Sequence, residues 1–203
     1  VVRDGKLRMD VVKGVPEVLP LGQGGLLDIA LHPDFTENRR IYITYSAGRR
    51  RANRTMLARG RINEDLTELT KVKTLFQVAQ AKKGGQHFGS RLLWLDDGTL
   101  LMSIGDGGNP PLQLDGRLVR LNAQDLSSHL GKTLRLDEDG KPAANNPFAD
   151  DGDPRTDPYI WTYGHRNIQG LALHHQSRAV WATEHGARGG DELNLLREGQ
   201  NYG

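Results

Sequence analysis

The sequence has no cysteine, no strong excess of either charge and no long hydrophobic run, and each absence excludes a class of protein. Without cysteine, the 203 residues form no disulfide, no thiolate metal site and no cysteine nucleophile. No stretch approaches the roughly 18 apolar residues of a membrane helix, so membrane insertion is not expected. Lys and Arg total 27 against 25 Asp and Glu, a balance that argues against nucleic acid as a partner.

Glycine, in contrast, is abundant at 25 residues, and long helical periodicity is scarce. Most apolar runs are short and end at turn residues, which is typical of an all-β protein. The one helix that we expect is short, at residues 122–130. The expected strands lie at residues 26–31, 41–45, 54–62, 73–78, 91–94, 100–104, 132–136, 160–163, 170–174, 179–183 and 192–196.

One pattern occurs three times, at residues 27–45, 91–104 and 169–183. Each copy is an apolar strand, a polar turn and a second apolar strand. Repeated hairpins of this kind predict the blades of a β-propeller. At ~40–50 residues a blade, residues 1–203 would be a single partial propeller domain of about four blades, truncated at both ends. A β-sandwich is the alternative that hairpins alone also allow.

Polar motifs adjoin these hairpins, and in a propeller such loops meet at the central channel. His87, which lies in a glycine-rich segment, is suited to general-base chemistry, although an ordinary loop histidine would look the same. Asp106 could orient a histidine, or could bond its own turn. Arg166 and Asn167 could hold a carboxylate or carbonyl oxygen, or Arg166 could form a surface ion pair.

A glycine-rich loop at residues 184–192 ends in the acidic pair Asp191 and Glu192. Backbone carbonyls in such a loop are good ligands for a hard cation such as calcium, although the spacing is not that of an EF-hand. Two other acidic stretches, 137–140 and 150–153, are interpreted as solvated turns. The sequence has no nucleophile elbow, phosphate loop or HExxH motif.

Short motifs follow one another in a fixed order along nearly the whole chain, from about Val15. They lie at residues 23–27 with 32–35, 87–89, 105–107, 163–167, 184–186, 191–194 and 199–203. In this order they resemble the soluble quinoprotein glucose dehydrogenases and the related bacterial aldose sugar dehydrogenases. The stretch at 186–190 is closer to the aldose sugar dehydrogenase branch.

The resemblance implies a six-bladed β-propeller that holds pyrroloquinoline quinone (PQQ) and calcium and oxidises aldose sugars to lactones. It implies that His87 is the general base for the sugar hydroxyl proton, while hydride passes to C5 of PQQ. Asp106 would orient His87, and Arg166 would lie beside the quinone oxygen.

The resemblance also implies two sets of ligands. The implied cofactor contacts are Gln23, His87, Arg166, Asn167 and His185. The implied calcium ligands are the carbonyls of Gly186 and Ala187 beside the cofactor, with Glu192 and Tyr202 at a second, structural site.

An aldose substrate and an artificial or respiratory electron acceptor are the implied partners of a monomer or homodimer. A periplasmic or secreted location follows from the family alone, since no basic, apolar leader opens the sequence. Two other functions stay open: a calcium-dependent sugar-lactone hydrolase, which would need carboxylates lining the channel, and a non-catalytic binding propeller. The joint presence of His87, Asp106 and Arg166 favours the dehydrogenase.

Overall fold

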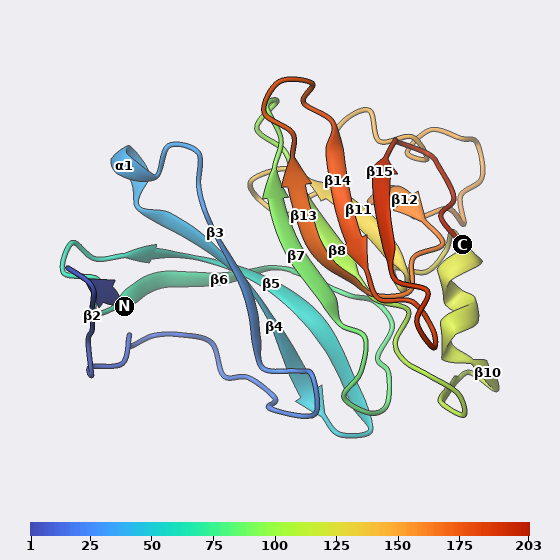
Figure 1. Cartoon of the computed structure of the whole chain (residues 1–203), viewed down its shortest axis with the longest axis horizontal. Coiled ribbons are helices and arrows are strands. Elements are labelled where there is room, and N and C mark those ends of the chain that lie inside the picture. Colours follow the sequence, from blue (N-terminus) through green and yellow to red (C-terminus); the bar gives the residue numbers. More distant parts are fainter.

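The chain folds into antiparallel β-sheets, and the computed structural model describes residues 1–203 apart from the side chain of Arg3 (Figure 1). The long strands are β3 (Leu26–Leu31), β4 (Arg40–Arg49), β5 (Ala52–Ile62), β6 (Leu69–Gln77), β7 (Gly89–Trp94), β8 (Leu100–Ile104), β11 (Lys132–Leu136), β12 (Ile160–Tyr163), β13 (Ile168–Leu173), β14 (Val180–Glu184) and β15 (Glu192–Leu196). The prediction of an all-β protein is confirmed.

The remaining elements are short. They are β1 (Val2–Arg3), β2 (Lys6–Leu7), α1 (Phe35–Asn38), β9 (Gln113–Leu114), β10 (Arg117–Leu118) and the 3-10 helix η1 (Val119–Gln124). Among the described elements, no helix has the length and hydrophobicity of a membrane span.

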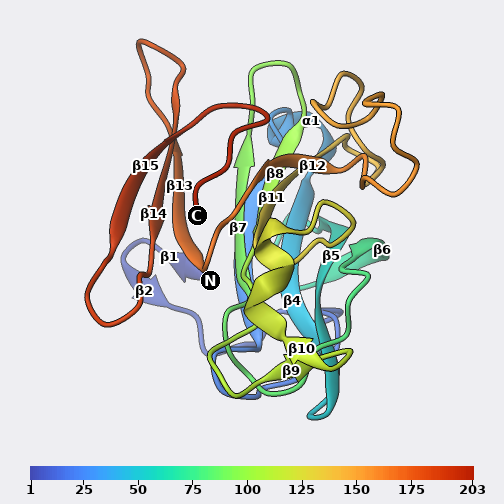
Figure 2. The same cartoon turned by 90° about the vertical axis from the view of Figure 1, so that its right-hand side faces the viewer.

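Three large sheets lie side by side in chain order (Figure 2). The first has the order β3-β4-β5-β6, the second β7-β8-β11-β12 and the third β13-β14-β15. The three hairpin repeats of the sequence are the first two strands of the three sheets. Strand β7 contacts both β3 and β13, so the first strands of successive sheets are neighbours. This is the arrangement of propeller blades and not of the two facing layers of a sandwich.

The number of sheets is smaller than the expected number of blades. The chain forms three large sheets and not about four, because long connections at residues 105–131 and 137–159 interrupt the second sheet. These connections lengthen that blade well beyond the ~40–50 residues assumed from the repeat alone.

The expected helix at residues 122–130 is wrong in extent. The structure has the 3-10 helix η1 there, and the chain continues as turns and irregular backbone from Asp125. Local side-chain bonds end the helix: Asn122 Nδ2 donates to the carbonyl of Val119 at 2.7 Å, and Asp125 Oδ1 accepts from the backbone of Ser127 at 3.0 Å. Such bonds offer the backbone an alternative to helical pairing.

The second sheet is packed on both faces, which orients its two neighbours. Leu100 and Met102 of β8 join the core shared with the first sheet, whereas Leu101 joins the core that contains Ile168 of β13. Side chains alternate between the faces of a strand, so one buried strand serves two interfaces. Each large side chain buried in this way stabilises the fold by about 1.5–3 kcal/mol.

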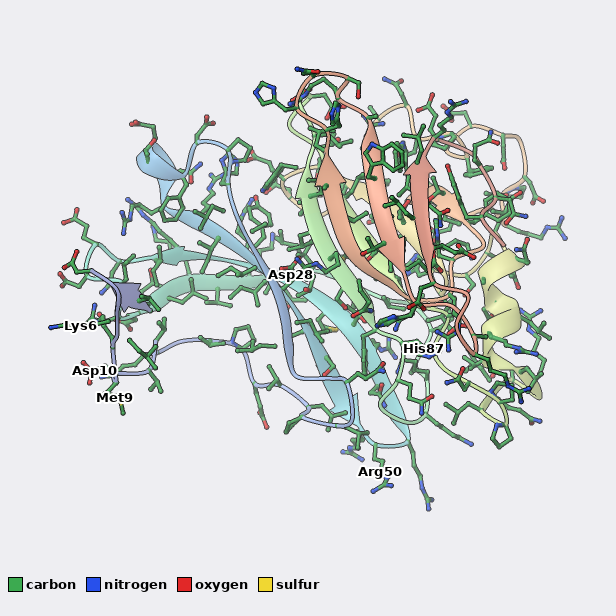
Figure 3. The ribbon with its side chains drawn as sticks, viewed as in Figure 1. Lys6, Met9, Asp10, Asp28, Arg50 and His87 are labelled. Atoms are coloured by element: carbon green, nitrogen blue, oxygen red, sulfur yellow. The ribbon has the colours of Figure 1, made fainter. Side chains whose placement is uncertain are left out.

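The first strands of the first two sheets are also joined by a carboxylate. Asp28 of β3 accepts the backbone N–H of Leu92 in β7 at 2.8 Å and lies 3.3 Å from the Arg91 guanidinium (Figure 3). On its opposite face the first sheet carries an apolar groove of about 870 Å³, lined in part by Leu26 and Ile29. That sheet is therefore apolar on both faces, as expected of a blade with neighbours on each side.

Candidate active site at the ends of the inner strands

The predicted catalytic residues gather at one end of the sheets. His87 lies two residues before β7, Arg166 lies two residues before β13, and Asp106 lies two residues after β8. In an antiparallel pair the start of one strand and the end of the next share an edge, so β7 and β8 bring His87 and Asp106 together. His87 lies at the lower end of these strands in Figure 3.

His87 and Asp106 form a buried pair. His87 Nδ1 lies 2.6 Å from Asp106 Oδ1, and the two residues are 3% and 4% exposed. The same oxygen accepts the backbone N–H of Gly108 at 2.9 Å, which fixes the carboxylate. A carboxylate at Nδ1 selects the tautomer with hydrogen on Nδ1, so the lone pair of Nε2 is left to act as a base. Nε2 bonds to none of the described residues and is not sealed from solvent.

The backbone holds His87 in an unusual conformation. Its φ is +48°, in the left-handed region that costs a non-glycine residue about 1–3 kcal/mol. Gln23 supports this geometry because its Oε1 accepts the His87 N–H at 2.7 Å. A Cβ at Gly105 would lie 2.3 Å from the His87 carbonyl oxygen, so this close approach requires glycine.

Arg166 presents a cation beside the pair. Its backbone carbonyl accepts the N–H of Asp106 at 2.8 Å, while Nη1 donates to the carbonyl of His185 at 2.9 Å and Nη2 to Asn109 Oδ1 at 3.0 Å. Among the described residues no carboxylate pairs with this guanidinium. A half-buried guanidinium that is bonded only to neutral oxygens is suited to an anionic ligand.

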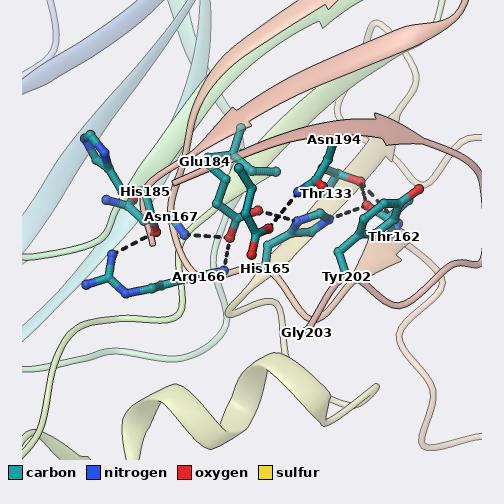
Figure 4. Close-up of polar contacts among 12 residues, drawn as sticks. Thr133, Thr162, His165, Arg166, Asn167, Glu184, His185, Asn194, Tyr202 and Gly203 are labelled. Carbon is teal, nitrogen blue, oxygen red and sulfur yellow. Dashed lines mark hydrogen bonds and ion pairs between the residues drawn. The ribbon is translucent and has the colours of Figure 1, made fainter. Parts of the chain in front are cut away.

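Glu184, at the end of β14, organises the segment that carries Arg166 (Figure 4). Its Oε1 accepts the backbone N–H groups of Arg166 and Asn167, the latter at 3.1 Å. Its Oε2 lies 2.8 Å from Nδ1 of His165, a fully buried residue. On the far side, Nε2 of His165 lies 2.8 Å from Thr162 Oγ1. Both carboxylate oxygens of Glu184 and both ring nitrogens of His165 therefore have a partner, which holds the segment in place.

The glycine-rich loop after β14 carries the expected calcium ligands. The N–H of Gly186 donates to Asp191 Oδ1 at 2.9 Å, while the carbonyls of Gly186 and Ala187 accept no backbone hydrogen bond from any described residue. Across the described residues, no group of three or more His, Asp or Glu side chains is arranged to hold a metal. Free carbonyl oxygens are the donors that calcium prefers, so this loop fits the ion through its backbone.

The two residues implied in a second calcium site have other contacts. Glu192 Oε2 accepts from Asn194 Nδ2 at 2.9 Å. The hydroxyl of Tyr202 donates to the Leu195 carbonyl at 2.8 Å and accepts the Arg197 N–H at 2.7 Å. A second calcium site at Glu192 and Tyr202 stays a prediction.

Comparisons with known proteins assign the chain to a family. A family model described as glucose/sorbosone dehydrogenase matches residues 1–203. The chain belongs to the glucose/sorbosone dehydrogenase family. Its family relatives include the aldose sugar dehydrogenase YliI of Escherichia coli, 40% identical over 95% of this chain and 49% of that protein. The protein slr1608 of Synechocystis is 54% identical over the whole chain and 50% of its own length.

A solved structure extends the likeness to the fold. The PQQ-bound form of an aldose sugar dehydrogenase from Streptomyces coelicolor has a TM-score of 0.75 and 34% identity, over 93% of this chain and 50% of that one. This match confirms the predicted propeller fold. The chain spans about half the length of the relatives it matches.

The predicted site residues of this member of the glucose/sorbosone dehydrogenase family do not all have the same surroundings. Gln23, His87, Asp106 and Arg166 are joined by hydrogen bonds into one site. Asn167 is only 1% exposed, and its Oδ1 accepts the Gly89 N–H at 3.1 Å, so it anchors the start of β7.

His185 has an exposed side chain, 3.8 Å from the carboxylate of Asp191. Sequence reasoning assigned no role to Glu184. Its position directly before His185, in the motif that follows β14, is the only sequence signal for it.

Proposed function

We propose that the protein containing this chain oxidises aldose sugars to lactones with PQQ and calcium as cofactors. Family membership and the PQQ-bound aldose sugar dehydrogenase relative support this proposal. The observation that carries it is the buried pair of His87 and Asp106, with Nε2 of His87 free and the Arg166 cation beside it.

The residues present fit both cofactors. An anionic quinone would find the uncompensated guanidinium of Arg166, with the exposed side chains of Gln23 and His185 nearby. The free carbonyls of Gly186 and Ala187 would hold calcium. When bound, PQQ would accept the hydride from the sugar carbon, and calcium would polarise the accepting carbonyl.

The residues of the chain supply the proton chemistry. His87 takes the proton of the sugar hydroxyl on Nε2 and becomes an imidazolium. Asp106, 2.6 Å from Nδ1, stabilises that positive charge and keeps the ring oriented. Arg166 provides a fixed positive charge where negative charge develops.

Reconstitution of the full-length protein with PQQ and calcium, followed by dye reduction with a panel of aldoses, tests the proposal. We expect activity that requires both additions. His87→Ala should lower turnover at least ~100-fold while PQQ still binds. His175→Ala is the matched control, because His175 is exposed in the turn between β13 and β14.

An unchanged rate for His87→Ala would remove His87 from the role of base. A folded protein that binds no PQQ and reduces no dye would refute the dehydrogenase, and lactone hydrolysis would be assayed next. The proposal includes an electron acceptor as second partner and a periplasmic or secreted location, which stay predictions.

A further inference from the structure

A further charged residue is buried close to the His87–Asp106 pair. Lys82 lies in the connection before β7 and is only 3% exposed. Its Nζ lies 3.7 Å from the centroid of the Phe88 ring, next to His87 in the chain. Its Cδ lies 3.2 Å from where a Cβ on Gly107 would stand, next to Asp106. The side chain therefore runs between the chain neighbours of both members of the pair.

The ammonium of Lys82 forms no hydrogen bond with any described residue. Lys132 shows how a buried lysine is normally accommodated, because its Nζ donates to three carbonyl oxygens at 2.8–2.9 Å. Burial lowers the pKa of Lys82 to about 8, although attraction to Asp106 opposes the decrease. An unsatisfied buried cation destabilises a fold. Residues that destabilise the fold in this way are concentrated at functional sites.

We propose that Lys82 is a positioning residue of the His87–Asp106 pair, whose ammonium attracts the Asp106 carboxylate and helps to hold it in place beside His87. The proposal rests on the proposed function for its catalytic consequence. The Phe88 ring stabilises the cation through its face, which offsets part of the cost of the missing hydrogen bonds.

The arrangement has an effect on proton uptake by His87. A protonated His87 and Lys82 would be attracted to the same carboxylate, so the two positive charges would repel each other, and a neutral residue at position 82 would remove that repulsion. The other charged group beside the pair is Arg166, from the loop before β13. Its guanidinium is bonded to Asn109 and His185 and keeps its charge at every pH of interest.

The first test needs neither cofactor nor substrate. Lysine side chains in the full-length apo protein are labelled with ¹³C and ¹⁵N, and the Lys82 signal is assigned as the one lost in Lys82→Met. We expect a lysine that titrates near pH 8, with a pKa that falls further in Asp106→Asn because the attracting carboxylate is gone. A Lys82 titration that Asp106→Asn leaves in place would overturn the proposal.

The second test uses the holoenzyme. In Lys82→Met the acid limb of the kcat/KM profile should move to higher pH by about half a unit or more, so that the rate at one pH on this limb falls ~3-fold or more. Lys83→Met is the matched control, since Lys83 is the exposed neighbour. An unmoved limb contradicts the proposal. Weaker PQQ binding in Lys82→Met, combined with a Lys82 titration that Asp106→Asn leaves unchanged, also contradicts the proposal, because Lys82 would then be a cofactor ligand. If no aldose is oxidised, the apo titration still decides the question.

Discussion

Replacing Lys82 by methionine should stabilise the protein at neutral pH. Burial lowers the pKa of Lys82 from 10.5 to about 8, which corresponds to about 3 kcal/mol at 1.36 kcal/mol per pKa unit. Below pH 8 both the folded and the unfolded chain carry this proton, so the folded state bears the full cost. Between pH 8 and 10.5 the unfolded chain holds the proton that the folded chain has released, and the stability of the wild type rises with pH.

The measurement is the free energy of unfolding from denaturant curves of wild type and Lys82→Met at pH 7 and pH 10. The advantage of the variant should shrink by about 2.5 kcal/mol over this interval, because any packing gain from methionine does not depend on pH. A variant that is less stable at pH 7, or an advantage that is equal at both pH values, refutes the account of Lys82 as an unsatisfied buried charge.

Lys132 provides a contrasting case for the same substitution. Burial also lowers its pKa, to about 7, but its ammonium donates to the carbonyls of Asn122, Ala123 and Leu130. Lys132→Met would leave the Leu130 carbonyl without a partner, at about 1–3 kcal/mol, whereas the carbonyls of Asn122 and Ala123 would each keep one backbone N–H donor. The hydrogen bond lost in Lys132→Met therefore offsets part of the gain from removing a buried charge, a loss that Lys82→Met does not incur.

Further predictions concern the site itself. Asp106→Asn should lower kcat ~100-fold or more with little change in PQQ affinity, measured by dye reduction and by PQQ titration, because the imidazolium loses its counter-charge. Glu184→Gln should lower the free energy of unfolding by about 1–3 kcal/mol and weaken PQQ binding, because His165 and the Arg166 segment lose a charged acceptor. Chelation of calcium should abolish PQQ binding and leave the fold of the blades intact by circular dichroism, since the expected ligands are carbonyls of the exposed loop at Gly186. PQQ affinity that is unaffected by chelation would exclude that loop as the site.

The strands were accessible from the sequence because period-2 alternation and turn residues are local signals. Strands β3, β8, β11, β12 and β15 have the bounds that the pattern predicts, and β7 differs only at its first two residues. Strands β4 and β5 extend further than predicted, because pairing in register continues through polar residues such as the stretch 46–49, while β6 begins four residues earlier than predicted and ends one residue earlier. Backbone pairing across a long hairpin does not need apolar side chains, so composition underestimates its length.

The size of the second blade could not be predicted by counting residues. The three hairpin repeats correspond one to one with the three sheets, and they were the better guide to the number of blades. Chain length overestimates that number because the connections at 105–131 and 137–159 add residues without adding a sheet. Loops carry few local signals for their path, since their backbone polar groups are satisfied by distant partners, as when Lys132 binds three loop carbonyls.

Part of the site also could not be predicted from the sequence, and the reason is physical. His87, Asp106 and Arg166 adjoin strand ends and lie in glycine-rich or polar motifs, so their convergence follows once the hairpins are placed. Nothing in the sequence around Lys82 distinguishes it from Lys83, yet one is buried and the other exposed. The difference arises because the connection before β7 pairs with Asn53 through two backbone bonds of 2.8 and 2.9 Å, which direct Lys82 inward toward Phe88. A pairing between residues 29 positions apart decides which of two adjacent lysines can act on the carboxylate of Asp106, and only the three-dimensional arrangement contains that information.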